Sequence, residues 1–387
     1  MRFRLLFLAL SATFFSHAYN PLLTIVLMVK NEAPVIRETL QPFIDAGIDS
    51  YFIFDTGSTD DTITITEAFF KQHNISNAII IQEPFVDFAT SRNRALDLAD
   101  ELFEDGCFIL MPDAEWYTKN VEHLIQFCEE QKDAPCPAYL VRIIGTNIDF
   151  YIPRLLRIKS KLRFSGVVHA QIQTKTHTRA PKDIFFHWNP SRYGVQKSKR
   201  KWVRDRELLL KEYEKNPNNT RTVFYLAQTY ESLGDWENAC KWYEMRVNMD
   251  GWNEENFMAL YKLAKAYEQL KNWEKALYYY LEASACRPHR AEPLIRVANH
   301  YWKTGNKELC FLFARRACEI PYPETDSLFI EKTLYEFTRY DLLGRSAWYV
   351  GAYNIGEQAA QEALKAHPNV GYLKTNLDCY KDYKGKN

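Results

Sequence analysis

The sequence lacks the short motifs that identify several common classes of α/β enzyme. No G-x-G-x-x-G follows the first apolar run, so the dinucleotide-binding fingerprint is absent. No G-x-x-x-x-G-K-S/T occurs, which excludes a P-loop. No G-x-S-x-G elbow occurs either, which argues against an α/β-hydrolase.

The chain also lacks paired cysteines and an excess of charge. None of its eight cysteines form a C-x-x-C pair, which argues against a structural zinc site, and their spacing does not indicate any disulfide pairing. Basic and acidic side chains number 49 each. This balance gives no reason to expect nucleic acid or an anionic membrane as a partner.

No apolar run reaches transmembrane length. The run at residues 5–15 follows two arginines and precedes the small residues Ser16 and Ala18, which is the layout of a secretory signal peptide. Residues 1–18 are therefore predicted to be a signal peptide or a short anchor. This predicts a protein of the secretory pathway or an exported one, with membrane association facing the cytosol as the alternative.

Strands and helices alternate in the first part of the chain, residues 20–195. Strand, helix, strand at intervals of about 27 residues predicts right-handed crossovers and a parallel sheet covered on both faces. Residues 138–188 contain shorter strand-like pieces without a long helix, which predicts a mixed or antiparallel extension. The predicted strands are 23–29, 50–56, 78–84 and 107–112, and the predicted helices are 34–47, 59–73 (capped from Ser58 or Thr59) and 90–106.

The rest of the chain, residues 200–380, contains an internal repeat. FYLAQTYESLGDWENACKWY and LYKLAKAYEQLKNWEKALYYY share Ala, Tyr and Trp positions 37 residues apart, and IRVANHYWKTGNKELCFLFARRA continues the series. A degenerate fourth unit contains Gly351 and Ala363. Small residues at helix crossings, aromatics between helices and glycine at the turn are typical of tetratricopeptide hairpins.

Acidic residues follow several of the predicted strands. Lys30-Asn31-Glu32 follows the first strand, residues 55–61 follow the second, Glu83 follows the third, and Asp113-Ala114-Glu115 follows the fourth. In an open parallel sheet, ligands bind beyond the carboxyl ends of the strands. Several carboxylates converging there could hold a divalent cation.

These segments resemble a known family. LTIVLMVKNEA, FIFDTGSTDDT, TSRNRAL and the D-x-E after the fourth strand resemble a family 2 glycosyltransferase of the GT-A fold, and LRFSGVVHA is similar to its G-x-V-H-E segment. The repeats resemble a helical domain fused to some of these transferases. The resemblance implies an α/β GT-A domain, Rossmann-like with a mostly parallel sheet, followed by an all-α tetratricopeptide-like domain.

The resemblance also implies a nucleotide-sugar donor, with a UDP-sugar as the first candidate. Asp55 would accept hydrogen bonds from the base, and Arg92 and Asn93 would contact the base, ribose or phosphate. Each assignment has a structural alternative: a helix cap for Asp55 and a solvated helix face for Arg92. The predicted donor-binding residues are Val29, Asn31, Glu32, Asp55, Ser58, Arg92, Asn93 and Asp113.

A metal site follows from the same resemblance. Asp113 and Glu115 stand where the family has D-x-D, and His169 matches a family histidine, although it could also be a core residue. These three residues would hold Mn²⁺ or Mg²⁺ against the diphosphate. A hard cation neutralises charge on this leaving group as the sugar C–O bond breaks.

Family members invert the anomeric centre, which requires a base to take the acceptor proton. Asp149, in GTNIDFY, is the positional candidate, and Glu115 and Asp183 remain alternatives. Ala170 departs from the family pattern, because many relatives have a glutamate there.

The sequence therefore predicts a metal-dependent transferase acting on a glycan, lipid or protein acceptor, with a protein partner for the repeats. The basic stretch KSKRK, residues 197–201, is interpreted as a solvated helix entry. Two alternatives stay open. One is a catalytically decayed domain that acts as a protein-binding module, and the other is a lectin-like module that binds free oligosaccharide.

Overall fold

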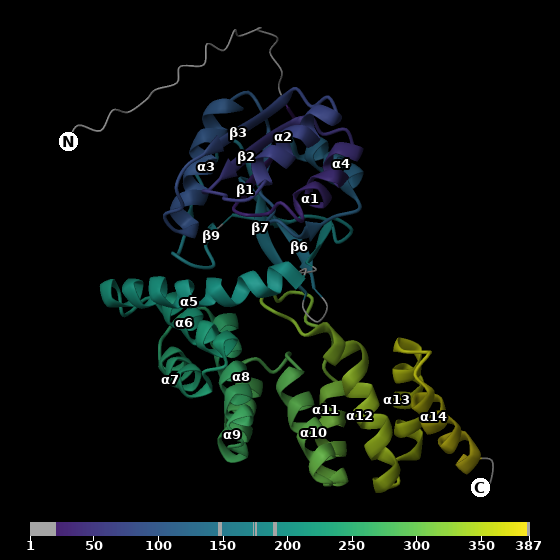
Figure 1. Ribbon diagram of the computed structural model, residues 1–387. Coiled ribbons are helices and arrows are strands. Elements are labelled where there is room, and N and C mark those ends of the chain that lie inside the picture. Colours follow the sequence, from purple (N-terminus) through teal and green to yellow (C-terminus); the bar gives the residue numbers. More distant parts are fainter. Residues whose placement is uncertain (1–20, 146–148, 173, 175, 189–191, 385–387) are drawn as a thin grey trace, which may run out of the picture.

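The computed structural model describes residues 21–145, 149–172, 174, 176–188 and 192–384. The predicted signal segment, residues 1–18, lies outside the described residues. The described chain consists of an α/β part followed by an all-helical part, which lies beneath it in Figure 1.

Four parallel strands form one half of the main sheet, in the order β3-β2-β1-β4. Their carboxyl ends share one edge, as the sequence predicted. The bounds are β1 (Leu23–Val29), β2 (Ser50–Asp55), β3 (Asn77–Gln82) and β4 (Phe108–Leu110).

The other half of the sheet is mixed, which confirms the predicted extension. β7 runs antiparallel between β4 and β6, whereas β11 runs parallel to β6. Within this extension, β8 and β9 are two short strands that pair in a separate sheet. The bounds are β5 (Trp116–Tyr117), β6 (Ala138–Ile144), β7 (Asp149–Arg157), β8 (Phe164–Ser165), β9 (Gln171–Ile172), β10 (Thr178–Arg179) and β11 (Phe185–Trp188).

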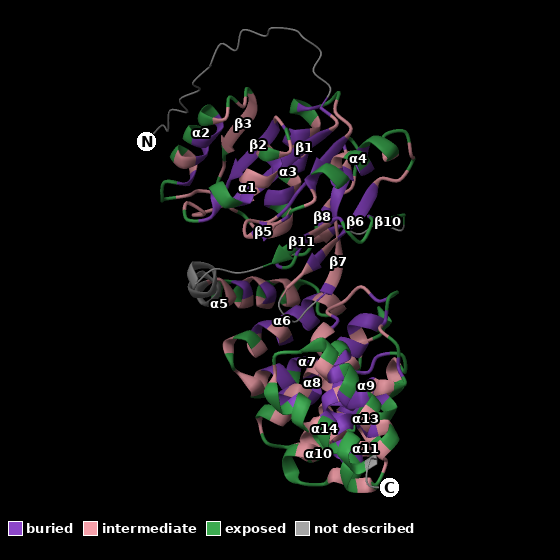
Figure 2. Cartoon of the chain, turned by 90° about the vertical axis from the view of Figure 1, so that its right-hand side faces the viewer, coloured by how far each residue is buried: buried purple, intermediate pink, exposed green. Residues whose placement is uncertain are grey.

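Helices cover both faces of the parallel strands; β1, β2 and β4 are buried between them, and the edge strand β3 is half-buried (Figure 2). Alternate residues of β1 enter two different cores, with Ile25 and Leu27 in one and Val26 in the other. This alternation is the period of two that a β-strand imposes on its side chains. The helices are α1 (Ile36–Asp45), α2 (Thr62–Gln72) and α4 (Val121–Gln131) on the first face and α3 (Phe88–Leu102) on the second.

Two local expectations were wrong. Helix α2 is not capped by Ser58 or Thr59, because both residues bond instead to the end of β1. Its N-cap residue is Asp61, and the Asp60 carboxylate accepts from the Thr62 backbone N–H at 3.1 Å. Helix α4 was not expected from the sequence pattern.

A long helix, α5 (Arg192–Lys215), runs between the sheet and the other helices (Figure 1). Three helical hairpins follow it, and a fourth, irregular unit begins with a π-helical turn at Leu334–Thr338 and includes a 3-10 turn at Ala347–Val350. The hairpin helices are α6 (Thr220–Leu233), α7 (Trp236–Val247), α8 (Asn253–Gln269), α9 (Trp273–Cys286), α10 (Glu292–Thr304), α11 (Lys307–Cys318), α12 (Arg339–Ser346), α13 (Tyr353–Ala366) and the terminal α14 (Gly371–Lys384).

The turns between the repeated helices share one backbone conformation, with a positive φ. Gly234 and Gly305 have positive φ at the turns within the first and third hairpins, as does Gly351 at the turn before α13, and Lys271 takes the same conformation in the second hairpin. A left-handed residue ends a helix and satisfies its last carbonyls, which explains why glycine is preferred at this position. The predicted hairpin turns are thus confirmed, including the one that lacks glycine.

A segment between the third and fourth units, residues 322–331, joins the helical part to the sheet. Asp149 at the start of β7 and Ile330 exchange backbone hydrogen bonds of 3.1 and 3.3 Å. The Arg179 guanidinium donates to three backbone carbonyls of the same segment. On the helical side, Glu254 accepts from the backbone N–H groups of Ser327 and Leu328.

All eight cysteines are free thiols, and Cys128, Cys240 and Cys310 are buried. Across the described ranges, no helix combines the length and apolar character needed to cross a membrane.

Candidate functional site

A cavity of about 1020 Å³ lies between the carboxyl edge of the sheet and the first helical hairpins. Its walls come from both parts of the chain. The sheet part contributes the end of β1, the loop after β4 and residues of β7, and the helical part contributes side chains of α5, α6, α8 and α10. Ligand sites at the carboxyl ends of parallel strands are the general rule for such sheets.

The end of β1 forms one wall of the cavity. Val29, Asn31 and Glu32, all predicted to bind the donor, line it together with Thr56. Asn31 has a φ of 55°, and its side-chain oxygen accepts from the Thr59 backbone N–H at 2.7 Å. The turn after β2 is thereby fixed against the end of β1.

Asp55 and Ser58 stabilise this turn and are not among the residues that line the cavity. The Asp55 carboxylate is completely buried and accepts from the backbone N–H groups of Gly57 and Ser58, the Ser58 hydroxyl and the Gln82 amide. The Ser58 hydroxyl in turn accepts from the Asn31 backbone N–H at 2.8 Å. Asp55 therefore fixes the turn that supports Asn31 in the cavity wall, without lining the cavity itself.

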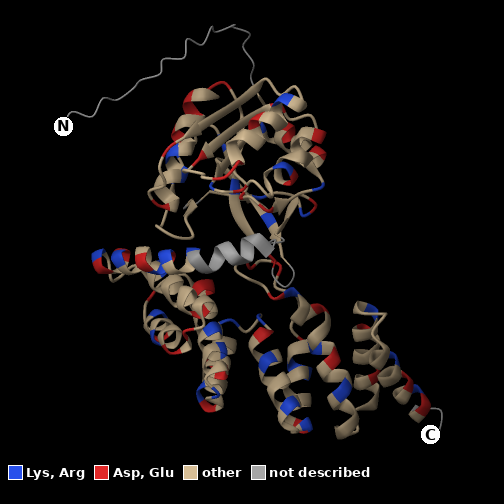
Figure 3. Ribbon diagram, viewed as in Figure 1, with Lys and Arg blue, Asp and Glu red and all other residues tan. Residues whose placement is uncertain are grey.

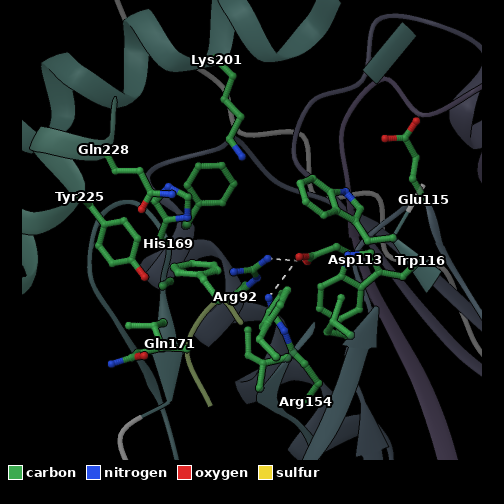
Figure 4. Close-up of a pocket in the computed structure, with 18 of the residues that line it drawn as sticks. Arg92, Asp113, Glu115, Trp116, Arg154, His169, Gln171, Lys201, Tyr225 and Gln228 are labelled. Carbon is green, nitrogen blue, oxygen red and sulfur yellow. Dashed lines mark hydrogen bonds and ion pairs between the residues drawn. The ribbon is translucent and has the colours of Figure 1, made fainter. Parts of the chain in front are cut away.

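Asp113 lies at the centre of the cavity and is bound by two arginines. Arg92 of α3 donates to its carboxylate at 2.5 Å and Arg154 of β7 at 3.2 Å (Figure 4). Burial alone would raise the pKa of Asp113, but the charges of Arg154, Arg92 and Lys201 outweigh it and lower the pKa below the usual value. Asp113 is therefore an ionised partner of these cations.

Both guanidinium groups lie close to the phenyl ring of Phe164. Arg92 and Arg154 lie 5.4 and 5.3 Å from its ring centroid, and Arg154 is also 5.3 Å from that of Trp116. Cations over aromatic faces are attracted by the ring quadrupole. The aromatic side chains thus hold both guanidinium groups in the cavity wall.

The three residues predicted to hold a metal do not converge. Glu115 lines the cavity with a φ of 67°, but its side chain points away from Asp113, and His169 lies on the opposite side (Figure 4). No group of three or more acidic, histidine or cysteine side chains suited to a metal occurs among the described residues. With Asp113 bound by arginines, this arrangement does not fit Mn²⁺ or Mg²⁺, and the metal requirement stays a prediction from the sequence.

His169 joins the two parts of the chain. Its ring stacks on Tyr225 of α6 with centroids 4.3 Å apart, and its backbone carbonyl accepts from Arg221 at 3.0 Å. Partial desolvation by the cavity walls and the nearby charges of Lys201 and Arg221 lower the pKa of His169, although the residue stays exposed to the cavity. The imidazole is therefore neutral at physiological pH.

Three other predicted residues are engaged away from the cavity lining. The Asn93 side chain bonds to the backbone N–H and carbonyl of Phe164. Asp149 is buried, ion-paired with Arg142 and hydrogen-bonded by Tyr322, so its carboxylate stabilises the junction between the two parts. Asp183 is exposed and pairs with His123 at 2.6 Å.

Several basic residues of the lining were not expected as site residues. Charges are scattered over the outer faces of both parts (Figure 3), whereas the lining has a clear excess of cations. Lys201 belongs to KSKRK, and the expectation that this stretch is only a solvated helix entry was wrong for Lys201, because α5 crosses the cavity. The further lining cations are Arg154, Arg204, Arg221, Lys262, Lys265 and Arg296.

One weak signal for these residues existed in the sequence. Arg154 is the charged residue within the otherwise apolar IPRLL, and a charge in a buried strand suggests a partner or a ligand. Lys262, Lys265 and Arg296 read as ordinary polar positions of the repeat, and only the folded arrangement brings them to the cavity.

Comparison with known proteins agrees with this division of the chain. Residues 24–186 match the family model described as Glycosyl transferase family 2. The N-terminal part is a family 2 glycosyltransferase domain. Residues 225–256 match the tetratricopeptide repeat model. The glycosyltransferase domain supports a general transferase activity, and the repeats support a protein-binding module.

Solved structures similar to this chain are tetratricopeptide proteins that align with its helical part. The MamA crystal structure is 17% identical, covers 51% of this chain and 98% of its own, and has a TM-score of 0.35. YrrB, described as a TPR protein with an unusual peptide-binding site, is 16% identical, with coverages of 46% and 85% and a TM-score of 0.37. A TPR protein from Cytophaga hutchinsonii is 15% identical, with coverages of 49% and 70% and a TM-score of 0.38. No curated protein sequence matched the chain.

Proposed function

We propose that this protein transfers a sugar from a nucleotide-sugar, with a UDP-sugar as the first candidate, to a glycan, lipid or protein acceptor with inversion. The observation that carries the proposal is the cavity itself. It opens at the carboxyl edge of a family 2 glycosyltransferase sheet and is lined by cations suited to a diphosphate. The nucleoside lies against Val29, Asn31 and Thr56 in this proposal.

The transfer requires a base on the acceptor side. The acceptor oxygen forms a bond to the anomeric carbon, the C–O bond to the diphosphate breaks, and the diphosphate leaves with the electron pair. Glu115 takes the acceptor proton in this proposal, because it is a carboxylate of the cavity lining that lies apart from the cluster of Asp113, Arg92 and Arg154. Asp149 is bound by Arg142, which makes it the weaker candidate.

The acceptor occupies the helical side of the cavity in this proposal. Tyr261, Gln228 and Trp252 offer polar and aromatic surfaces there. A protein acceptor, or a protein that delivers the acceptor, would use the adjoining repeats. Entry into the secretory pathway remains a proposal from residues 1–18.

A nucleotide-sugar screen tests the function. The full chain is incubated with UDP-, GDP- and other nucleotide-sugars, each with EDTA, Mn²⁺ or Mg²⁺, and release of the nucleoside diphosphate is measured. We expect release from one donor class by the wild type and strongly reduced release by Glu115→Gln purified in the same way. Absence of donor binding and release in every condition would instead favour the decayed, protein-binding alternative.

A further inference from the structure

The centre of the cavity contains more positive than negative charge. Arg92, Arg154 and Lys201 all act on the single carboxylate of Asp113. Asp205 lies one helical turn after Lys201 on α5 and provides one further carboxylate. The cations therefore outnumber the carboxylates, and two of them, Arg92 and Arg154, are almost fully buried, where an uncompensated charge is costly.

Two of these cations also have unused hydrogen-bond donors. Arg154 and Arg92 are 3% and 6% exposed, and both line the cavity. The Nε and Nη1 atoms of Arg154 and the Nε atom of Arg92 are buried and lack a hydrogen-bond partner within the described part of the chain. Unsatisfied buried donors destabilise a fold unless a ligand uses them.

An anionic oxygen is the ligand that matches these groups. Guanidinium groups bind phosphate oxygens through two parallel N–H bonds, and such charge-assisted bonds are stronger than neutral ones. The aromatic contacts of both guanidinium groups with Phe164 fix their positions before a ligand arrives. A diphosphate carries about two negative charges and thus suits a site with an excess of cations.

We propose that Arg92, Arg154 and Lys201 bind the donor diphosphate directly and without a divalent cation, and that Asp113 is their displaceable counter-ion. This inference rests on the proposed transferase function. The same cations stabilise the charge that develops on the diphosphate as its bond to the sugar breaks. Asp113 then competes with the diphosphate, whereas in a metal site the same carboxylate would promote donor binding.

The two modes of binding predict opposite effects for one substitution. Removing the Asp113 charge frees two arginines for the ligand if the diphosphate binds them directly. Removing it from a metal site eliminates a ligand and weakens metal-dependent binding. Asp113→Asn keeps the size of the side chain, so the sign of its effect distinguishes the two modes.

The test is titration calorimetry of the full chain with UDP and with inorganic pyrophosphate, in EDTA, Mn²⁺ or Mg²⁺. We expect UDP to bind in EDTA, with a dissociation constant that changes less than about twofold when Mn²⁺ is added. Asp113→Asn should bind UDP in EDTA as tightly as the wild type or more tightly. Arg92→Gln and Lys201→Gln should each weaken binding about tenfold or more, the loss of one charge-assisted contact.

A matched control lies on the same helix as Arg92. Arg94 is exposed and pairs with Glu83 outside the cavity lining, so Arg94→Gln should bind UDP like the wild type. Arg154 is deeply buried, and Arg154→Lys with a thermal unfolding measurement separates loss of the anion site from loss of the fold.

The outcomes separate this inference from the proposed function. UDP binding that requires Mn²⁺ and is lost in Asp113→Asn would overturn the metal-free site and leave the transferase in place. Binding of pyrophosphate in EDTA, without turnover of any nucleotide-sugar, would support the anion site and count against the transferase. Absence of UDP and pyrophosphate binding in all conditions would overturn both.

Discussion

The rings of His169 and Tyr225 lie 4.3 Å apart and are nearly parallel. His169 follows the short strand β8, and Tyr225 belongs to the first hairpin helix. Arg221, one turn earlier on α6, also donates to the His169 carbonyl. The first repeat thus positions a loop of the transferase domain.

We expect Tyr225→Leu to reduce nucleotide-sugar turnover about tenfold, because small displacements of a binding wall misplace the reacting groups. The measurement is initial rate per folded protein, checked by circular dichroism. Tyr230→Leu is the control on the same helix, since Tyr230 is not among the residues that line the cavity. An equal loss in both variants would show a general effect on α6 instead.

Glu115→Gln should separate catalysis from binding. Loss of a general base lowers rates by about 10²–10⁴-fold, while donor affinity should stay within about twofold of the wild type. The turnover number and the donor dissociation constant are measured independently. Unchanged turnover would remove Glu115 as the base.

Asp149→Asn should have a different effect. Asp149 is buried against Arg142 and Tyr322, so the substitution leaves the arginine without its charge partner. Breaking a buried ion pair costs about 3–5 kcal/mol, and we expect a lower melting temperature with turnover per folded molecule preserved. A severe loss of turnover at full stability would restore Asp149 as a catalytic candidate.

The segment that joins the two parts should be sensitive to acid. Burial alone would raise the pKa of Asp326, but hydrogen bonds from Arg287, Arg290 and His289 outweigh it and lower the pKa. A carboxyl group whose folded pKa is lowered stabilises the fold fully above its unfolded pKa of about 3.9, and this contribution disappears as the pH falls further.

We therefore expect Asp326→Asn to lower the free energy of unfolding at pH 7, with the difference from the wild type shrinking below about pH 4. Urea unfolding at a series of pH values measures this difference. A constant difference across the series would mean that the Asp326 charge does not stabilise the fold.

A further prediction concerns the packing of the last helices. A Cβ atom added at Gly356 would lie 2.2 Å from the Tyr380 hydroxyl oxygen, which donates to the Gly344 carbonyl at 2.6 Å. Gly356→Ala should destabilise α14 by about 1–3 kcal/mol, the usual cost of overpacking. Hydrogen exchange of α14 is the measurement, and Gly371→Ala, with no atom within 4 Å, is the control.

Regular features of this fold were predictable from sequence because they repeat. The Ala, Tyr and Trp positions that recur 37 residues apart indicated the helical hairpins, and the apolar runs before Asn31 and Asp113 located one edge of the sheet. The sequence did not predict which side chains contact one another in the cavity. Asp113 binds arginines from α3 and β7, and a pattern along one strand does not indicate which distant side chains meet it.

The position of Lys201 in the cavity could not be predicted from a local sequence pattern either. KSKRK is ordinary for an exposed helix, and its last lysine lines the cavity only because α5 crosses the carboxyl edge of the sheet. The path of that helix depends on its packing against α6, the next helix of the chain, which a pattern within KSKRK does not indicate.

The backbone bridge between Asp149 and Ile330 has a mechanical consequence. A rotation of the repeats away from the sheet would break those two hydrogen bonds and the hydrogen bonds that Arg179 donates to the same segment. In the proposed transferase, these bonds would keep the opening of the cavity in place, and the width of that opening would select the acceptors that enter.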